Sequence, residues 1–429
     1  MNLNYRHLIV LLGVLPLAAQ GQRAPQEPRG AVPSGTYRNL FVEAGYPAAE
    51  VRAKVDAAFQ QLFYGDPDTQ TLYYTAGKNE NGELAYVMDI NNNDVRSEGM
   101  SYAMMIAVQL DKKKEFDALW NWAKTYMYRD EAAHPCRGYF SWSMKRDGTP
   151  NDETPAPDGE EYFVMALYFA AGRWGNGTGI YNYRAEADQL LIDMLHHPVV
   201  TGTVRRRHGE PMKHTSGNMF HPEHKMVRFV PGVERWDFTD PSYHLPAFYE
   251  LWARWGPEND RRFWAEAADA SREFFQRSAH PQTSLTPEYA YFDGGGYRGP
   301  GMSRENFIVD AWRTAMNWSV DWAWWEKDER ERQLSDRLQA FFESKGMNDY
   351  PSSYRLNGTP LGRGRHSAGL VAMNAVASLA ATNEERAKKF VQALWEQPVP
   401  SGRGRYYDGM LHMLALLHCS GEFRAWTPK

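Results

Sequence analysis

The sequence predicts an all-α fold, and three observations lead to this prediction. Apolar residues recur at helical spacing in twelve segments of the 429-residue chain, whereas the alternation with period two that is typical of strands is hard to find. Four long connections, near 128–157, 197–242, 278–302 and 344–365, are rich in Gly, Pro, Asp and aromatic residues. Loops of this length in a compact domain usually build a functional site. Twelve helices can pair into six hairpins, whose long loops would then form that site.

The first expected helix follows a proline suited to a first helical turn, and Val51, Val55, Phe59 and Leu62 lie on one face of it. The other eleven expected helices are near 97–110, 113–127, 158–172, 182–196, 243–254, 260–277, 303–325, 328–343, 366–381, 384–396 and 404–419. Because no Ser/Thr/Pro-rich linker divides these segments, we expect residues 37–429 to form a single domain.

The N-terminal segment indicates export. Residues 1–21 have the pattern of a signal peptide, with Arg6 before an apolar run from Leu8 to Ala19 and small residues after it. This run is too short to span a bilayer comfortably, and no later stretch approaches ~20 apolar residues. Residues 22–36 are rich in Pro, Gly and charge and are expected to form a flexible leader. We therefore expect an exported chain without a membrane span in its mature form, either periplasmic or secreted.

The composition excludes some partners and suggests others. A net charge of −5 gives no electrostatic argument for a nucleic-acid-binding protein. Aromatic residues make up 14% of the chain, which is more than a core needs and suggests aromatic surfaces that face a ligand. Cys136 and Cys419 are the only cysteines, and whether they form a disulfide or remain two thiols stays open.

The first acidic motif places Glu98 at the start of an expected helix, with Ser97 as its N-cap. One interpretation is that Glu98 only complements the helix dipole. The dipole lowers the pKa of a carboxyl group at this position, whereas a general acid needs a raised pKa. For Glu98 to act as an acid, burial or a neighbouring carboxylate would have to outweigh the dipole.

Two further acidic motifs have equally plain structural alternatives. Asp158 with Glu161 forms a capping-box pattern, so Asp158 could serve only as a helix cap. Asp310 and Arg313 are three residues apart in the helix expected at 303–325 and share a face. Arg313 could hold Asp310 ionised, as a general base requires, or the two could form an ordinary surface ion pair.

Several aromatic residues occur in loops and not on helical stripes. These are Tyr139, Phe140, Trp142, Trp236, Phe238, Tyr243, Tyr291 and Tyr297. A sugar ring has an apolar C–H face and a belt of hydroxyl groups, which aromatic rings beside carboxylates would match. Packing in the core is the alternative for each of them.

Three patterns do not indicate cofactor or metal binding. The glycine-rich run 294–299 fits G-x-G-x-x-G but lacks a βαβ context. The run 89–94 resembles the start of a calcium loop but lacks its glycine and its final acid. The histidines between 196 and 224 have no helical zinc spacing. We therefore expect no metal ligands and no cofactor.

In order along the chain, the motifs resemble glycoside hydrolase family 8, from about Tyr37 to Trp426. The resemblance is carried by Arg96–Tyr102, Pro157–Glu161, Asp240–Leu251, Asp310–Arg313 and Arg405–Asp408. Within the family the chain is most similar to exo-oligoxylanases that release xylose from the reducing end.

The resemblance implies an (α/α)6 barrel of about twelve helices, with long loops forming a substrate cleft, and hydrolysis with inversion at the anomeric carbon. Glu98 matches the general acid and Asp310 the general base. The matching substrate-binding residues are Asp158, which grips the distorted sugar, Trp142, which is similar to a stacking platform, and also Tyr243, Arg313 and His366. His366 matches the histidine of a loop that closes the far end of the cleft in the exo-acting members.

Two departures from the family pattern concern the site. In the exo-acting members the closing loop reads Leu-His-Pro, whereas here it reads Arg365-His366-Ser367, so the rigidity of proline is lost. Val309 precedes the expected base at a position where a small polar residue is expected. This difference could affect how the attacking water is held.

The leading hypothesis is an exported inverting glycosidase that removes xylose from the reducing end of β-1,4-xylo-oligosaccharides and acts as a monomer. An endo-acting xylanase, glucanase or chitosanase on the same scaffold is the first alternative. A non-catalytic carbohydrate-binding protein is the second, although the retention of Glu98, Asp158 and Asp310 argues against it.

Overall fold

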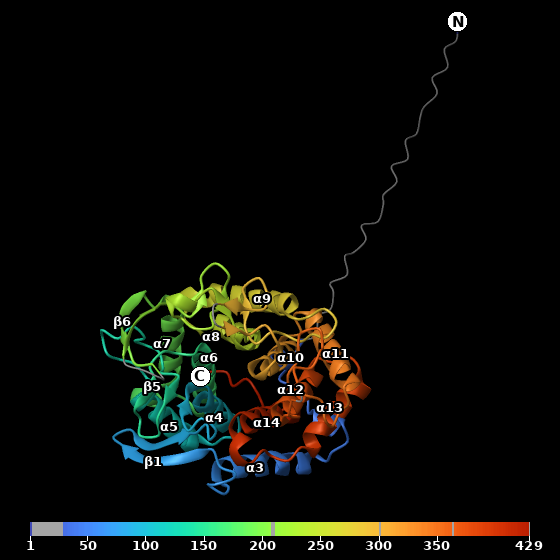
Figure 1. Cartoon of the computed structure of the whole chain (residues 1–429), viewed down its shortest axis with the longest axis horizontal. Coiled ribbons are helices and arrows are strands. Elements are labelled where there is room, and N and C mark those ends of the chain that lie inside the picture. The colour runs from blue at the N-terminus through green and yellow to red at the C-terminus, as the bar shows by residue number, and fades with distance from the viewer. Residues whose placement is uncertain (2–28, 207–210, 300–301, 363, 429) are drawn as a thin grey trace.

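The computed structural model describes residues 29–206, 211–299, 302–362 and 364–428, together with Met1. Twelve helices of this part of the chain form two concentric layers (Figure 1). The inner layer comprises α4 (Ser97–Gln109), α6 (Pro157–Trp174), α8 (Pro246–Trp255), α10 (Thr314–Trp325), α12 (Ala368–Val376) and α14 (Arg405–Ser420). The outer layer comprises α3 (Ala48–Tyr64), α5 (Lys113–Trp122), α7 (Tyr183–His196), α9 (Arg261–Ser278), α11 (Glu329–Ser344) and α13 (Glu384–Glu396). The predicted all-α (α/α)6 barrel is confirmed.

Burial explains why the helices separate into two layers. In α4 every residue except Glu98 is buried, and α6 is buried almost throughout. A helix that is apolar all round has to lie inside other elements. In α9, by contrast, Trp264, Ala267, Ala268 and Ser271 form one buried stripe, which is the pattern of a helix with a second face in solvent.

The helix expected at 303–325 begins later than predicted. Ile308 is extended, residues 309–313 form a 3-10 turn, and α10 starts at Thr314. Val309 has a φ of 27°, an unfavourable backbone conformation for a β-branched residue, and Phe307 is paired with Tyr354 through two backbone hydrogen bonds. Asp310 therefore lies in a tight turn at the mouth of the barrel and not inside a helix.

The expected N-cap Ser97 is wrong, and the alternative in which Asp158 only caps a helix does not hold. Ser97 is the first residue of α4, and the preceding Arg96 makes no side-chain cap. Helix α6 begins at Pro157, whose ring suits the first helical position. Asp158 is thus inside the first turn and not at the N-cap position.

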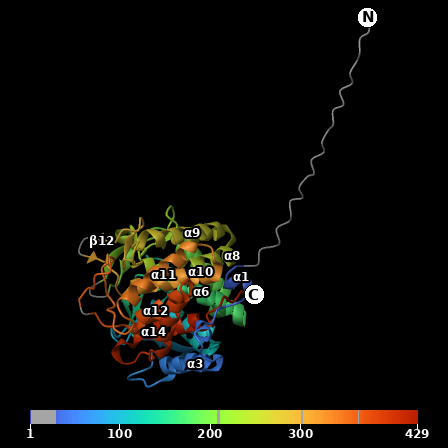
Figure 2. The ribbon, with the colours of Figure 1, turned by 90° about the vertical axis from the view of Figure 1, so that its right-hand side faces the viewer.

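The long loops contain short strands that the sequence pattern did not reveal. The described residues form six small antiparallel sheets. Their strands are β1 (Tyr73–Asn79), β2 (Gly82–Val87), β3 (Val95–Arg96), β4 (Ser143–Met144), β5 (Pro150–Asp152), β6 (Val200–Val204), β7 (Met212–Ser216), β8 (Phe220–His221), β9 (Met226–Val227), β10 (Phe238–Thr239), β11 (Ala290–Tyr291), β12 (Arg298–Gly299) and β13 (Met302–Ser303). Most of them are too short to show a period. In Figure 2 the loops around β12 lie at one end of the barrel, while α1 and the C-terminus lie at the other.

Part of the expected leader is packed on the barrel. Residues Ala31–Ser34 form α1, which lies against α10, and Ala31 is buried. The flexible leader expected at 22–36 is therefore wrong for these residues. A further short helix, α2, spans Leu40–Glu43. The expected signal peptide, apart from Met1, and the start of the leader lie outside the described residues.

No helix in the described ranges has the length and apolarity needed to cross a membrane. Cys136 and Cys419 are both buried free thiols.

Candidate active site

One guanidinium group brings three carboxylates together. Nη1 of Arg313 donates to Oε2 of Glu98 at 3.0 Å and to Oδ2 of Asp158 at 2.9 Å. Nη2 of Arg313 forms an ion pair with Oδ1 of Asp310 at 3.2 Å. The acids come from α4, α6 and the turn before α10, which are far apart in sequence. Since only 1% of Arg313 is exposed, the cluster lies deep in the mouth of the barrel.

The guanidinium also limits the distance between Glu98 and Asp310. Each acid contacts a different nitrogen of the same planar group. Their nearest oxygens can therefore be no more than about 9 Å apart, an upper limit compatible with the roughly 6.5–9.5 Å that leaves room for a water molecule in inverting glycosidases.

The surroundings of Glu98 favour its protonated form. Its Oε1 accepts a hydrogen bond from the Tyr406 hydroxyl at 3.0 Å. Burial raises the pKa of Glu98 to about 7, the charges of Asp158 and Asp310 add to this rise, and Arg313 opposes it. The condition set by the sequence is thus met, because burial and neighbouring carboxylates outweigh the effect of the helix dipole.

The surroundings of Asp310 are more open. About a quarter of its side chain is exposed, compared with 6% for the side chain of Asp158. The Tyr407 hydroxyl lies 3.4 Å from Oδ1 of Asp310 and 3.2 Å from the carbonyl oxygen of Val309. The cluster therefore contains one carboxyl group with a raised pKa, Glu98, which is 16% exposed, and one carboxylate beside a cation, Asp310, which is 24% exposed.

These carboxyl groups line a cleft of about 340 Å³. Trp142, Tyr243 and Tyr289 contribute aromatic surface to its wall. The guanidinium of Arg96 lies over the indole of Trp142, 5.4 Å from the ring centre. The guanidinium of Arg313 lies 5.7 Å from the centre of the Tyr243 ring. A narrow cleft with aromatic walls and acids at its floor suits a sugar chain.

The structure brings together six of the seven predicted site residues, namely Glu98, Asp310, Asp158, Trp142, Tyr243 and Arg313. His366 is not among the residues that line this cleft. Its Nδ1 is 3.0 Å from the carbonyl oxygen of Tyr350, in the loop before α12. The other loop aromatics divide between core and surface, since Tyr139, Phe140 and Phe238 are buried.

Sequence reasoning missed the tyrosines that hold the carboxyl groups. Tyr406 and Tyr407 lie within the motif Arg405–Asp408, yet no role was predicted for them. Tyr102 accepts a bond from Arg313 at 2.7 Å. Asp240 is fully buried beside Asp310, and burial raises its pKa well above its usual range. The motif containing Tyr406 and Tyr407 was a usable signal, because two adjacent tyrosines at a helix start point into the barrel.

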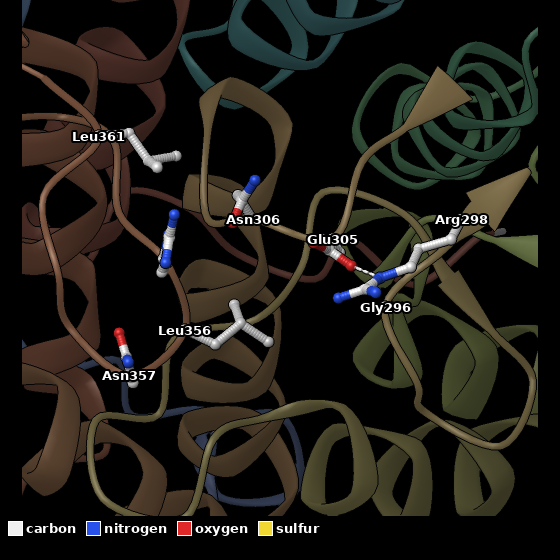
Figure 3. A pocket seen from close by; sticks show the side chains of 8 residues that line it. Gly296, Arg298, Glu305, Asn306, Leu356, Asn357 and Leu361 are labelled. Atoms are coloured by element: carbon white, nitrogen blue, oxygen red, sulfur yellow. Dashed lines mark hydrogen bonds and ion pairs between the residues drawn. The ribbon is translucent and has the colours of Figure 1, made fainter. Parts of the chain in front are cut away.

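A second, larger cavity of about 620 Å³ lies between loops 296–306 and 355–361. Figure 3 shows its lining, in which Arg298 is paired with Glu305. It shares no residue with the cleft and holds no group of carboxylates around a cation. The smaller cleft is therefore the candidate active site.

A helical barrel whose cleft is lined by aromatic rings and by two carboxyl groups on one guanidinium, one of them with a raised pKa, defines a hydrolase that acts on glycosidic bonds by acid and base catalysis. The model of the glycosyl hydrolases family 8 matches residues 79–421. The chain belongs to this family.

Curated relatives and solved structures are similar to this protein over almost its whole length. The reducing-end xylose-releasing exo-oligoxylanase Rex8A of Paenibacillus barcinonensis is 43% identical and covers 93% of this chain and 99% of its own. The structure of Rex8A with xylose matches with a TM-score of 0.83, over 93% of this chain and 100% of that chain. A GH8 xylobiose complex from Teredinibacter turnerae is 56% identical with a TM-score of 0.90, at 93% and 100% coverage. A second structure from that organism is described as a xylanase in complex with xylohexaose.

Proposed function

We propose that this protein is an inverting glycosidase that removes xylose from the reducing end of β-1,4-xylo-oligosaccharides. The observation that carries the proposal is that Glu98 and Asp310 lie on two nitrogens of the Arg313 guanidinium, with burial favouring the proton on Glu98. The exo-oligoxylanases that are 39–43% identical to this chain support the substrate and the direction of attack.

In the proposed mechanism, Glu98 donates its proton to the oxygen of the leaving sugar. Asp310, ionised and partly open to solvent, takes a proton from a water molecule that attacks the anomeric carbon from the opposite face. The bond to the leaving oxygen breaks as the new bond to water forms. Glu98 ends ionised and Asp310 ends protonated, so one proton must return to Glu98 before the next cycle.

The remaining predicted residues would bind the substrate. Asp158 would accept hydrogen bonds from hydroxyl groups of the sugar whose bond is broken, and these bonds would strengthen as the ring flattens. Trp142 and Tyr243 would supply apolar surface for sugar faces. Arg313 would fix the three acids, and His366 would close the reducing end of the cleft.

An endo-acting xylanase is a second candidate, and two observations favour it. The 56% identical protein from Teredinibacter turnerae is described as a xylanase. The loop that carries His366 also differs on both sides of the histidine from the pattern expected of exo-acting enzymes.

Xylotriose and xylohexaose labelled at the reducing end would separate the two candidates. We expect labelled xylose as the first product from both substrates. Labelled xylobiose or xylotriose as the main early product from xylohexaose would instead identify endo action. The absence of any hydrolysis would leave a sugar-binding protein without catalysis.

We further propose that residues 1–21 are removed during export and that residues 37–429 act as one monomeric domain, in the periplasm or outside the cell. The apolar run from Leu8 to Ala19 after Arg6 supports the signal peptide. This proposal is tested by expressing the full chain in a bacterial host, separating cytoplasmic and exported fractions, and sequencing the N-terminus of the protein in each fraction. We expect a mature terminus near residue 22 in an exported fraction, and an intact Met1 in the cytoplasm would contradict it.

A further inference from the structure

One carboxylate at the start of α14 holds the segment 365–369. Oδ1 of Asp408 accepts hydrogen bonds from the Ser367 hydroxyl at 2.5 Å and from the Gly369 N–H at 3.1 Å. Oδ2 of Asp408 forms an ion pair with Arg365. Only 6% of Asp408 is exposed, and a carboxylate so buried needs partners of this kind. All these partners come from a single short segment.

His366 lies between the two side chains that Asp408 binds. Its Nδ1 is 3.0 Å from the carbonyl oxygen of Tyr350, and its ring meets that of Tyr350 edge-on at 4.4 Å. Within the described part of the chain, Nε2 of His366 has no hydrogen-bond partner. The imidazole is therefore oriented through one nitrogen, and the other nitrogen is available to a ligand.

The two side chains bound by Asp408 are those at which the segment departs from the Leu-His-Pro pattern. A leucine in place of Arg365 could not form an ion pair. A proline in place of Ser367 would stiffen the backbone by itself, because its ring fixes φ. In this chain, side-chain bonds to Asp408 fix the segment at the same two positions.

The same turn of α14 also holds the reacting carboxyl groups. Tyr406 bonds to Glu98 and Tyr407 to Asp310, and Asp408 follows directly. Three consecutive residues therefore connect both acids and the segment carrying His366 to one helical turn.

We propose that Asp408, Arg365 and Ser367 form a latch that holds His366 at the reducing end of the cleft and so restricts release to a single xylose. Asp408 is a positioning residue in this account, since it acts through the segment and not on the sugar. The inference rests on the proposed exo action and explains how this chain achieves it without the proline.

The test compares product ratios from xylohexaose labelled at the reducing end. Arg365→Leu should raise the ratio of labelled xylobiose to labelled xylose severalfold, because the ion pair of an exposed arginine is screened by solvent. Asp408→Asn should raise the ratio about tenfold, the factor expected for the loss of one charge-assisted bond. The double variant Arg365→Leu with Ser367→Pro should restore the wild-type ratio. Arg262→Leu is the matched control, because Arg262 is also an exposed arginine in an ion pair, here with Glu266 on α9.

An unchanged ratio in Arg365→Leu would overturn the latch. This variant decides the matter even if Asp408→Asn does not fold, since two thirds of the Arg365 side chain is exposed. Failure of the double variant to restore the ratio would equally overturn it. If the wild type itself releases no single xylose from the labelled end, this result refutes the proposed exo action. It does not refute the fixation of segment 365–369 by Asp408.

Discussion

Nη1 of Arg313 lies 3.0 Å from Oε2 of Glu98, and the two side chains are 2% and 16% exposed. The same guanidinium also forms ion pairs with Asp158 and Asp310, so a single positive charge is shared by three acids. Burial disfavours the charged form of Glu98 more strongly than Arg313 favours it, which raises the pKa to about 7. The arrangement keeps one proton in the cluster at mildly acidic pH, as acid catalysis requires.

The raised pKa of Glu98 predicts the alkaline limb of the pH profile. Because Glu98 must carry its proton, kcat/KM should fall as pH rises through about 7. Asp158 raises this pKa through its negative charge, so Asp158→Asn should move the alkaline limb to lower pH. Measuring kcat/KM against pH on xylotriose checks both statements. Asp147→Asn serves as the control, and a limb that stays in place or moves upward in Asp158→Asn would contradict the account.

Removal of either reacting carboxyl group should abolish most activity and leave the fold intact. Glu98→Ala and Asp310→Ala should each lower kcat by several orders of magnitude, since proton transfer alone contributes ~10²–10⁴. The assay is release of reducing sugar, with circular dichroism to verify folding. If both variants hydrolyse xylo-oligosaccharides as fast as the wild type, the assigned roles are wrong.

Arg313→Met should destabilise the protein, because three acids would lose their shared cation. Breaking a buried ion pair by removing one partner costs about 3–5 kcal/mol. Without the cation, the pKa values of Glu98 and Asp158, which are already raised, should rise further, so the loss should be larger at pH 8 than at pH 5. Urea unfolding at both pH values measures it, with Arg262→Leu as the exposed control. Equal stability of Arg313→Met and the wild type at pH 8 would refute this expectation.

Glu160, which is not one of the catalytic carboxyl groups, should make the free energy of unfolding depend on pH. Its carboxyl group is buried, and Oε1 accepts a hydrogen bond from the Phe140 N–H at 2.9 Å. Burial raises its pKa from 4.5 to about 8. The folded state therefore binds the proton more tightly, and the contribution is complete below pH 4.5 and is lost as pH rises to about 8.

Each pH unit in that interval should remove about 1.4 kcal/mol of unfolding free energy through Glu160. Glu160→Gln remains neutral, so its stability should fall less steeply between pH 5 and pH 8. Denaturant unfolding across this range gives the two slopes. Identical slopes for the variant and the wild type would show that ionisation of Glu160 does not lower the free energy of unfolding.

The helices could be predicted from the sequence because each buries a continuous face. Trp264, Ala267 and Ser271 in α9 show the spacing that made this possible. The start of α10 could not be predicted, because the backbone of Phe307 pairs with Tyr354, almost fifty residues away. This pairing and the turn at Val309, and not local propensity, determine where Asp310 lies.

The acidic residues of the candidate site could be predicted from the sequence, but the residues that hold these acids in place could not. Glu98, Asp158 and Asp310 are recognisable by motif, and their distances in sequence gave no measure of their distances in space. The bond from Tyr406 to Glu98 joins residues 308 positions apart, and no local pattern reports such a contact. The raised pKa of Glu98 likewise depends on burial by the whole barrel. Two capping patterns misled because Ser97 and Asp158 are already inside their helices.

The central claim is that Glu98 and Asp310 act from opposite faces of one sugar. The most direct test is proton NMR of the anomeric signals during the first minutes of xylotriose hydrolysis, before mutarotation. We predict that the new reducing end of the xylobiose product appears first as the α anomer. Appearance of the β anomer first would mean retention through a covalent intermediate, and would contradict the roles assigned to both acids.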